Sequence, residues 1–204
     1  MASPENNASN TILRGQMTFD AEGTNVRGSR NYSRVVHWPG NELSGVTIGR
    51  GYDLGNRTQE QAYSDLRRVG ISESQARAIS LGVDRKGTRA REFVNNNRST
   101  IGEITAQQEV MLFNMIYPNY ENRARRNYNR YTRSLANRTE WEQLHPAIRD
   151  VVVDMVYQGF AGESAMSVAS GNDIDEFIQY IRNKPAYMEY EGNRKRIDYL
   201  DNNR

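Results

Sequence analysis

The chain of 204 residues contains no cysteine and only two histidines, His37 and His145. The absence of cysteine excludes disulfides, thiol catalysis and cysteine-ligated metals. The two histidines lie outside any spacing typical of a zinc site, and no acidic stretch resembles a calcium-binding loop. We therefore expect no metal and no cofactor.

Long apolar runs are also missing. Nowhere do about eighteen apolar residues follow one another, so no membrane span is expected. The N-terminal residues lack the basic start and apolar stretch of a secretory signal. We expect a soluble protein whose residues 1–9 form a disordered tail. A protein of this kind needs another system to deliver it if it acts on a cell wall.

Neither sign of charge dominates, because 27 basic residues stand against 25 acidic ones. The balance fails only locally: residues 122–138 contain six arginines and no acid, interleaved with Tyr128 and Tyr131. This run is open to three interpretations. It could bind nucleic acid, coat a solvated helix face, or draw the protein to an anionic cell wall.

The order of patterns along the chain predicts an α+β fold. A helix is expected over residues 10–21, followed by strands over 34–38 and 46–52 that the turn sequence Pro39-Gly40-Asn41 separates. Helices are expected from there to the end. At this length the chain suits a single domain over residues 10–204. We expect a hairpin lobe over about 24–56 and a helical lobe over about 57–204.

Capping signals locate several of the later helices. Three of them are Ser or Thr caps followed by Gln: Thr58 with Gln61, Ser72 with Gln75, and Thr105 with Gln108. Pro118 is expected to begin a separate, arginine-rich helix. Apolar residues at helical spacing predict further helices over 146–158, 173–182 and 185–200.

Glu22 and Asp53 are candidates for carbohydrate chemistry. Glycoside hydrolysis requires an acid that protonates the leaving oxygen and a second carboxylate. Glu22 stands at a helix end before Gly23, where the helix dipole disfavours a carboxylate, so helix stability does not account for it. A solvated surface carboxylate is the plain alternative. We expect Glu22 to lie where the two lobes meet, partly desolvated and protonated as a general acid must be.

Thr47 and Asp53 share strand parity and therefore point to one face. A straight strand would hold them about 20 Å apart, too far to serve one bound sugar. Gly49 and Gly51 permit a bend that would bring both side chains toward Glu22. Taken alone, Thr47 also fits an ordinary strand residue and Asp53 an ordinary turn residue.

Glu22-Gly23, the element Thr47-Ile48-Gly49-Arg50-Gly51 and Asp53 together resemble the Glu/Thr/Asp active site of phage-type lysozymes. The order, with the Asp after the Thr-Ile-Gly-x-Gly element, is most similar to that of the pesticin-like muramidases. The resemblance covers residues 12–56, and the rest only as a helical pattern. It implies a lysozyme-like α+β fold, mainly helical, with a small β-hairpin lobe flanking the active-site cleft.

The resemblance implies roles for these residues: Glu22 as general acid, Asp53 as the second carboxylate, and Thr47 as the residue that holds the catalytic water. Glu42 stays a rival to Asp53, because it lies near the place where the compact phage enzymes carry their Asp. The implied activity is hydrolysis of the β-1,4 bond between N-acetylmuramic acid and N-acetylglucosamine of peptidoglycan. Such a muramidase would serve as an endolysin, a bacteriocin or an interbacterial toxin.

Three further residues are candidate substrate contacts. Trp38 and Tyr52 could present flat faces to sugar rings or pack in the hairpin and core. Gln158 could hydrogen-bond substrate or simply end its helix. Bacterial peptidoglycan is the expected partner of a monomer, with room for an inhibitor or immunity protein.

A second hypothesis comes from a different class of protein. A non-catalytic lysozyme-like protein could bind peptidoglycan or nucleic acid through the arginine-rich helix over 122–138. The joint presence of Glu22, Thr47 and Asp53 favours the enzyme, so we do not expect nucleic acid as a partner.

Overall fold

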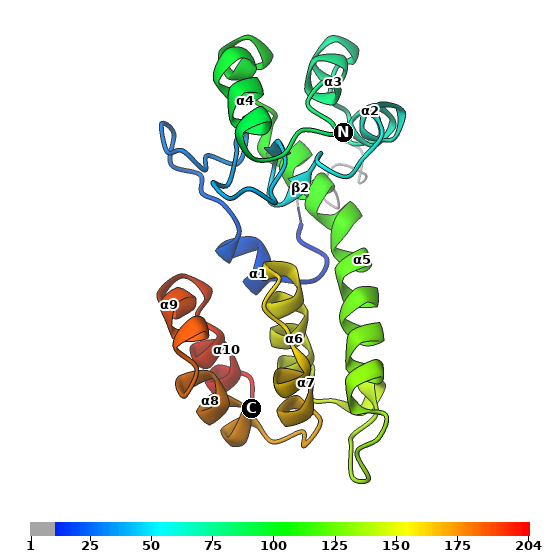
Figure 1. Ribbon diagram of the computed structural model, residues 1–204, viewed down its shortest axis with the longest axis vertical. Coiled ribbons are helices and arrows are strands. Elements are labelled where there is room, and N and C mark those ends of the chain that lie inside the picture. The colour runs from blue at the N-terminus through cyan, green and yellow to red at the C-terminus, as the bar shows by residue number, and fades with distance from the viewer. Residues whose placement is uncertain (1–10) are drawn as a thin grey trace, which may run out of the picture. The chain divides into compact units, whose positions relative to one another are not determined.

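The computed structural model describes residues 11–204 and is mainly helical with one two-stranded antiparallel sheet (Figure 1). The α+β class predicted from the sequence is therefore confirmed. The elements in chain order are α1 Gln16–Ala21, β1 Thr47–Ile48, β2 Tyr52–Asp53, α2 Gln59–Arg68, α3 Glu73–Ser80, α4 Gly87–Ile101, α5 Ala106–Thr132, the 3₁₀ helix Trp141–Gln143, α6 Pro146–Gln158, α7 Glu163–Ala169, α8 Ile174–Arg182, α9 Pro185–Arg194 and α10 Arg196–Asn202.

The chain divides into two compact units. Unit 1 contains residues 22–116 together with the described residues before Arg14, and unit 2 contains residues 14–21 and 117–204. This division differs from the expected boundary near residue 56, because α2, α3 and α4 belong with the hairpin and not with the later helices. The predicted tail over residues 1–9 lies outside the described residues.

The capping sequences start three helices of the chain as predicted. The hydroxyl oxygen of Thr58 accepts from the amide of Gln61 at 3.2 Å, and that of Ser72 accepts from the amide of Gln75 at 3.3 Å. At the start of α5 the box is reciprocal: the amide of Gln108 donates to Thr105 at 3.1 Å, and the Gln108 side chain accepts from the Thr105 amide at 2.8 Å. Each cap satisfies amides that a first helical turn leaves unpaired.

The single strand predicted over residues 46–52 is wrong, because this segment turns back on itself as a hairpin. β1 and β2 pair in antiparallel register, with Thr47 opposite Asp53 and Ile48 opposite Tyr52. Gly49 and Gly51 adopt φ values of 63° and 90°, which side chains rarely tolerate. The predicted bend at these glycines is confirmed, and it is a full turn.

The predicted strand over residues 34–38 is also absent as an element, although one antiparallel bridge remains. His37 and Thr47 exchange two backbone hydrogen bonds of 2.8 Å each. His37 is 5% exposed, so this bridge places a third backbone segment against the hairpin. On the sheet face opposite Thr47 and Asp53, Ile48 and Tyr52 are fully buried in the core of unit 1.

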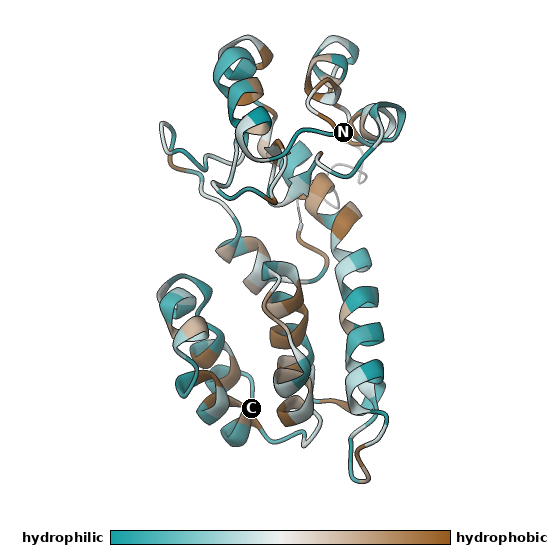
Figure 2. Cartoon of the chain, viewed as in Figure 1, coloured by the Kyte–Doolittle hydropathy of each residue, from teal (hydrophilic) through white to brown (hydrophobic). Residues whose placement is uncertain are grey.

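Helix α6 of unit 2 matches its predicted range. His145 caps it, Pro146 occupies its first turn, and Gly159 ends it in the left-handed region at φ 89°. Most residues between these ends are buried, and Figure 2 shows the helix largely in hydrophobic colour. We therefore regard α6 as the central helix of unit 2, packed against α1, α7 and α10.

Three other helix predictions need correction. Pro118 does not begin a helix but lies inside α5, which runs unbroken from Ala106 to Thr132. The helix predicted over 185–200 is two helices, α9 and α10, because Lys195 between them adopts the left-handed region at φ 52°. The first helix is shorter than predicted and begins at Gln16.

A buried charge network joins α6 to the end of unit 2. The carboxylate of Asp154, which is fully buried, accepts from Arg194 at 2.8 Å and from Arg196 at 2.7 Å. Arg196 is fully buried too and also donates to the side-chain oxygen of Gln158 at 2.6 Å. The αL residue Lys195 separates the two arginines and ends one helix before the next begins.

Candidate functional site

The hairpin brings Thr47 and Asp53 directly opposite each other. Residues paired in this way have Cβ atoms about 4.5–5.5 Å apart on one face of the sheet. Thr47 is 4% exposed, and its hydroxyl donates to the carbonyl of Gly45 at 3.3 Å. A hydroxyl and a carboxylate separated by five residues in sequence thus become neighbours through the turn at Gly49 and Gly51.

Two glycines hold the carboxylate of Asp53. Its Oδ2 accepts from the amide of Gly45 at 3.1 Å, and its Oδ1 accepts from the amide of Gly55 at 2.6 Å. A Cβ atom on Gly45 would come within 2.3 Å of Oδ1, and one on Gly55 within 2.9 Å. Glycine at both positions is therefore what lets the backbone approach this carboxylate closely.

Glu22 is tethered to the same hairpin. Arg50, which lies in the turn between Thr47 and Asp53, donates from Nη1 to the backbone carbonyl of Glu22 at 2.8 Å. Glu22 itself is half-buried. Three candidate residues from two segments of the chain therefore belong to one hydrogen-bonded part of unit 1.

A second link to the Glu22 segment runs through Ser33, which is fully buried. Its hydroxyl accepts from the amide of Thr24 at 3.0 Å, and its carbonyl accepts from the amide of Gly49 at 2.7 Å. Gly23 adopts a φ of 76°, and a Cβ atom there would lie 2.0 Å from the Ser33 hydroxyl. The glycine after Glu22 is thus required by close packing as well as by its backbone angle.

Glu109 is a functional candidate that the sequence analysis missed. It is 2% exposed and forms an ion pair with Arg50, with Nε and Oε1 separated by 3.2 Å. Burial raises the pKa of Glu109, and Arg50 opposes that rise. The pairing fixes the guanidinium that also holds Glu22. The only local signal was a charged residue next to the apolar run that begins at Val110.

His37 stands beside Thr47 with an altered proton affinity. Burial lowers the pKa of His37 from its ordinary value of 6.5, the hydrogen bond to Val35 opposes this, and the charge of Arg98 adds to it. The ring Nδ1 lies 3.0 Å from the carbonyl of Val35. A neutral imidazole thus belongs to the folded hairpin region.

Trp38 is half-buried, and its indole Nε1 donates to the carbonyl of Asn41 at 3.2 Å. The guanidinium carbons of Arg30 and Arg91 lie 5.1 Å and 5.9 Å from the ring centre. Glu42, the rival carboxylate, is exposed in the loop that follows Trp38.

Tyr52 and Gln158 are engaged within the protein. Tyr52 is fully buried, its hydroxyl donates to Asp65 at 2.8 Å, and the guanidinium of Arg57 lies 4.1 Å from its ring centre. Burial raises the pKa of this phenol. Gln158 belongs to unit 2, where it accepts from Arg196. Both side chains therefore have partners within the protein, and the substrate contact of each stays a prediction.

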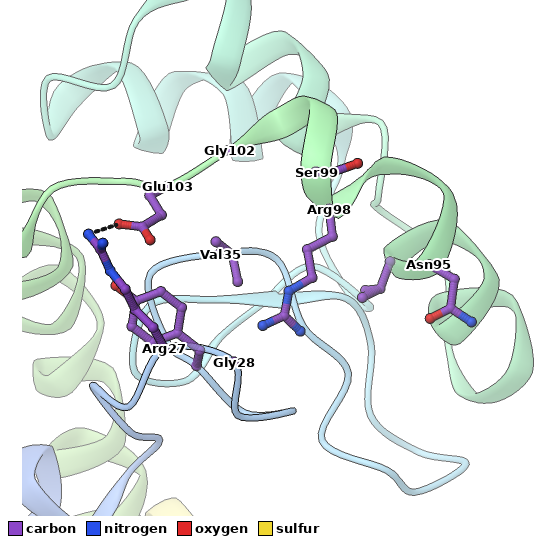
Figure 3. Close-up of a pocket in the computed structure, with 10 residues that line it drawn as sticks. Arg27, Gly28, Val35, Asn95, Arg98, Ser99, Gly102 and Glu103 are labelled. Carbon is purple, nitrogen blue, oxygen red and sulfur yellow. Dashed lines mark hydrogen bonds and ion pairs between the residues drawn. The ribbon is translucent and has the colours of Figure 1, made fainter.

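Unit 1 also contains a pocket of about 540 Å³ between the segment after Glu22 and the end of α4 (Figure 3). Arg27, Arg98 and Glu103 supply its charged groups, and Figure 3 shows the ion pair of Arg27 with Glu103 at its edge. Arg98 is held by the carbonyls of Ser29 and Arg30. None of the lining residues is Glu22, Thr47 or Asp53, so this pocket is separate from the candidate residues predicted from the sequence.

The fold and the site define a mainly helical α+β protein in which a glycine-rich hairpin pairs a threonine with an aspartate and holds a glutamate through its backbone carbonyl. The chain belongs to the family described as "Domain of unknown function (DUF8812)", whose model matches residues 15–197. A comparison with curated proteins found no match. Among the described helices, none is both long and apolar enough to cross a membrane.

Proposed function

We propose that the chain is a muramidase with a lysozyme-like fold, which hydrolyses the β-1,4 bond between N-acetylmuramic acid and N-acetylglucosamine of peptidoglycan. The observation that carries this proposal is the cross-strand pairing of Thr47 with Asp53. The tether from Arg50 to the Glu22 carbonyl supports it, because it attaches the third residue to the same hairpin.

In the proposed mechanism Glu22 protonates the leaving glycosidic oxygen, and Asp53 is the second carboxylate, which either activates a water or stabilises the oxocarbenium-like transition state. Asp53 receives one amide hydrogen bond on each oxygen, which fixes its orientation and leaves lone pairs for a water. Thr47 donates its proton to Gly45, so its oxygen remains an acceptor for that water.

The reaction we propose is hydrolysis and not lytic transglycosylation, because Thr47 and Asp53 offer a place to hold a water. The protein would act on the wall as an endolysin, a bacteriocin or an interbacterial toxin, after delivery by another system. Purified peptidoglycan should lose turbidity on addition of the protein alone. Mass spectra of the soluble fragments should show reducing muramic acid ends, and mainly anhydro-muramic ends would reject the hydrolase.

Charge-removing variants rank the carboxylates. Glu22→Gln removes the proton donor, and loss of general acid catalysis typically costs about 10²- to 10⁴-fold in turnover. Asp53→Asn should be nearly as severe. Glu42→Gln is the matched control, because solvent screens the exposed Glu42 and most activity should remain. Near-parental turnover of Asp53→Asn combined with an inactive Glu42→Gln would give the role of second carboxylate to Glu42.

A further inference from the structure

The second half of α5 and the turn that follows it carry a row of exposed arginines. We call this row the arginine stripe. Its members are Arg123, Arg126, Arg130 and Arg133. Arg123, Arg126 and Arg130 are spaced by three and four residues, which places them on one side of α5, and Arg133 follows in the turn just after α5 ends at Thr132. All four are exposed, whereas Ala124, Tyr128 and Thr132 on other sides of the helix are buried. Figure 2 shows this half of α5 in hydrophilic colour.

The charges of the arginine stripe are not neutralised by neighbours. Within the described residues, neither Arg123, Arg126 nor Arg133 forms an ion pair, and Arg130 donates to the hydroxyl of Tyr131. The other two arginines of the run differ: Arg125 pairs with Glu142 and Arg138 with Glu140. Nearby acids thus neutralise only the arginines outside the stripe.

An uncompensated row of this kind suits a linear polymer of phosphates. Guanidinium groups bind phosphate oxygens through two parallel hydrogen bonds, which lysine cannot reproduce. At about 1.5 Å per residue the three helical members, from Arg123 to Arg130, extend for about 11 Å along the helix axis, and Arg133 follows beyond the end of the helix. The stripe is therefore long enough to contact successive phosphates of one extended chain.

The surroundings of the stripe argue against two other partners. Single-stranded nucleic acid binds by stacking bases on aromatic rings, but Tyr128 is fully buried and donates to the carbonyl of Thr139 at 2.6 Å. Tyr131 is half-buried beside Arg130. A membrane-surface helix needs exposed apolar residues, and the exposed residues of α5 from Asn119 onward are asparagines and arginines.

We propose that the arginine stripe binds an anionic polyol-phosphate polymer of the bacterial wall. The choice of a wall polymer rests on the proposed function, since binding of this kind would hold a muramidase close to its glycan substrate. The binding itself is independent of Glu22, Thr47 and Asp53, which belong to the other unit.

The test is direct binding of the whole chain to soluble poly(glycerol phosphate), measured by titration calorimetry at several salt concentrations. Arg123→Gln, Arg126→Gln and Arg133→Gln combined should weaken binding by about tenfold or more, with a shallower dependence on salt because fewer counterions are released. The matched control combines Arg68→Gln, Arg89→Gln and Arg182→Gln, which removes the same charge from exposed positions elsewhere. The control should bind like the parent.

Equal weakening in both triple variants would overturn the proposal, because net charge alone would then explain binding. Tighter binding of the parent to duplex DNA, or to vesicles of anionic phospholipid at equal phosphate concentration, would overturn it in favour of that partner. Hydrolysis is assayed separately on peptidoglycan stripped of the polymer, where the stripe variant should match the parent. Loss of hydrolysis there would also contradict the proposal, whereas polymer binding by a chain with no hydrolytic activity would refute only the muramidase.

Discussion

The two units bury charge in different ways. In unit 2 a single carboxylate, Asp154, is shared by two buried guanidiniums, Arg194 and Arg196. In unit 1 one guanidinium, Arg50, pairs with one carboxylate, Glu109, and also donates a hydrogen bond to the backbone carbonyl of Glu22. The network of unit 2 joins helices, whereas the pair of unit 1 positions a loop. Charge burial therefore serves packing in unit 2 and placement of candidate site residues in unit 1.

The largest effect should follow from breaking the shared network of unit 2. Asp154→Asn leaves two buried guanidiniums without the carboxylate that they share, and removing one partner of a buried pair costs about 3–5 kcal/mol. Urea unfolding followed by circular dichroism measures the loss. Asp175→Asn removes an exposed partner of Arg204, where solvent screens the charges, and should leave the free energy of unfolding nearly unchanged. Similar losses of unfolding free energy in Asp154→Asn and Asp175→Asn would show that the buried network does not stabilise the packing of unit 2.

The corresponding change in unit 1 should cost less. Glu109→Gln removes the charge from beside one buried guanidinium, where Asp154→Asn removes it from beside two, so we expect a smaller loss of about 1–3 kcal/mol in the free energy of unfolding. The parent gains stability from protonated Glu109 below the ordinary pKa of 4.5 and loses it as pH rises through the raised pKa of the folded state. The deficit of the variant should therefore shrink as pH rises. A deficit that grows with pH would show that Arg50 outweighs burial.

Two backbone amides, and not a guanidinium, hold the carboxylate of Asp53. We therefore expect its replacement to destabilise the fold less than the replacements of Asp154 and Glu109. Asp53→Asn offers one acceptor oxygen where Gly45 and Gly55 use two, so one amide loses its partner. We expect a loss of about 1–2 kcal/mol in addition to the loss of turnover. Urea unfolding and initial rates on the same preparations separate the two effects. Parental stability would mean that the two amide bonds contribute little.

The smallest effect is confined to acid pH. Because burial lowers the pKa of His37, its stabilising contribution is present above the ordinary value of 6.5 and is lost as pH falls through the folded-state pKa. His37→Asn keeps an amide donor for the carbonyl of Val35 and does not titrate. Melting temperatures of this variant should depend less on pH below about 6.5 than those of the parent. An unchanged pH profile would remove His37 as the cause.

Local chemistry explains which parts of the fold could be predicted. The caps Thr58, Ser72 and Thr105 and the Pro-to-Gly frame of α6 are short-range signals, and the structure confirms them. Helix α4 was not predicted because Lys86 at its start offers no side-chain cap. The break at Lys195 was missed because a lysine rarely adopts a positive φ.

In the candidate site, too, features set by neighbouring residues could be predicted from the sequence, and contacts between distant residues could not. The glycines of the hairpin indicated the bend between Thr47 and Asp53, since their backbone freedom is a property of the residues themselves. The partnership of Arg50 with Glu109 joins residues far apart in sequence, and no local pattern encodes it. The single strand predicted over 46–52 failed because the glycines turn the chain back fully, whereas Thr47 and Asp53 do share one face, as their parity predicted.

The discontinuity of unit 2 has a consequence for how the chain is made. Helix α1 leaves the ribosome before any other helix described here, yet the helices it contacts, α6 and α9, begin at Pro146 and Pro185. Residues 22–116, the greater part of unit 1, are synthesised in between. Until those helices are synthesised, α1 has no packing partners among them, and an isolated helix of this length is only marginally stable in water. Completion of unit 2 is therefore a late event that depends on the C-terminal third of the chain.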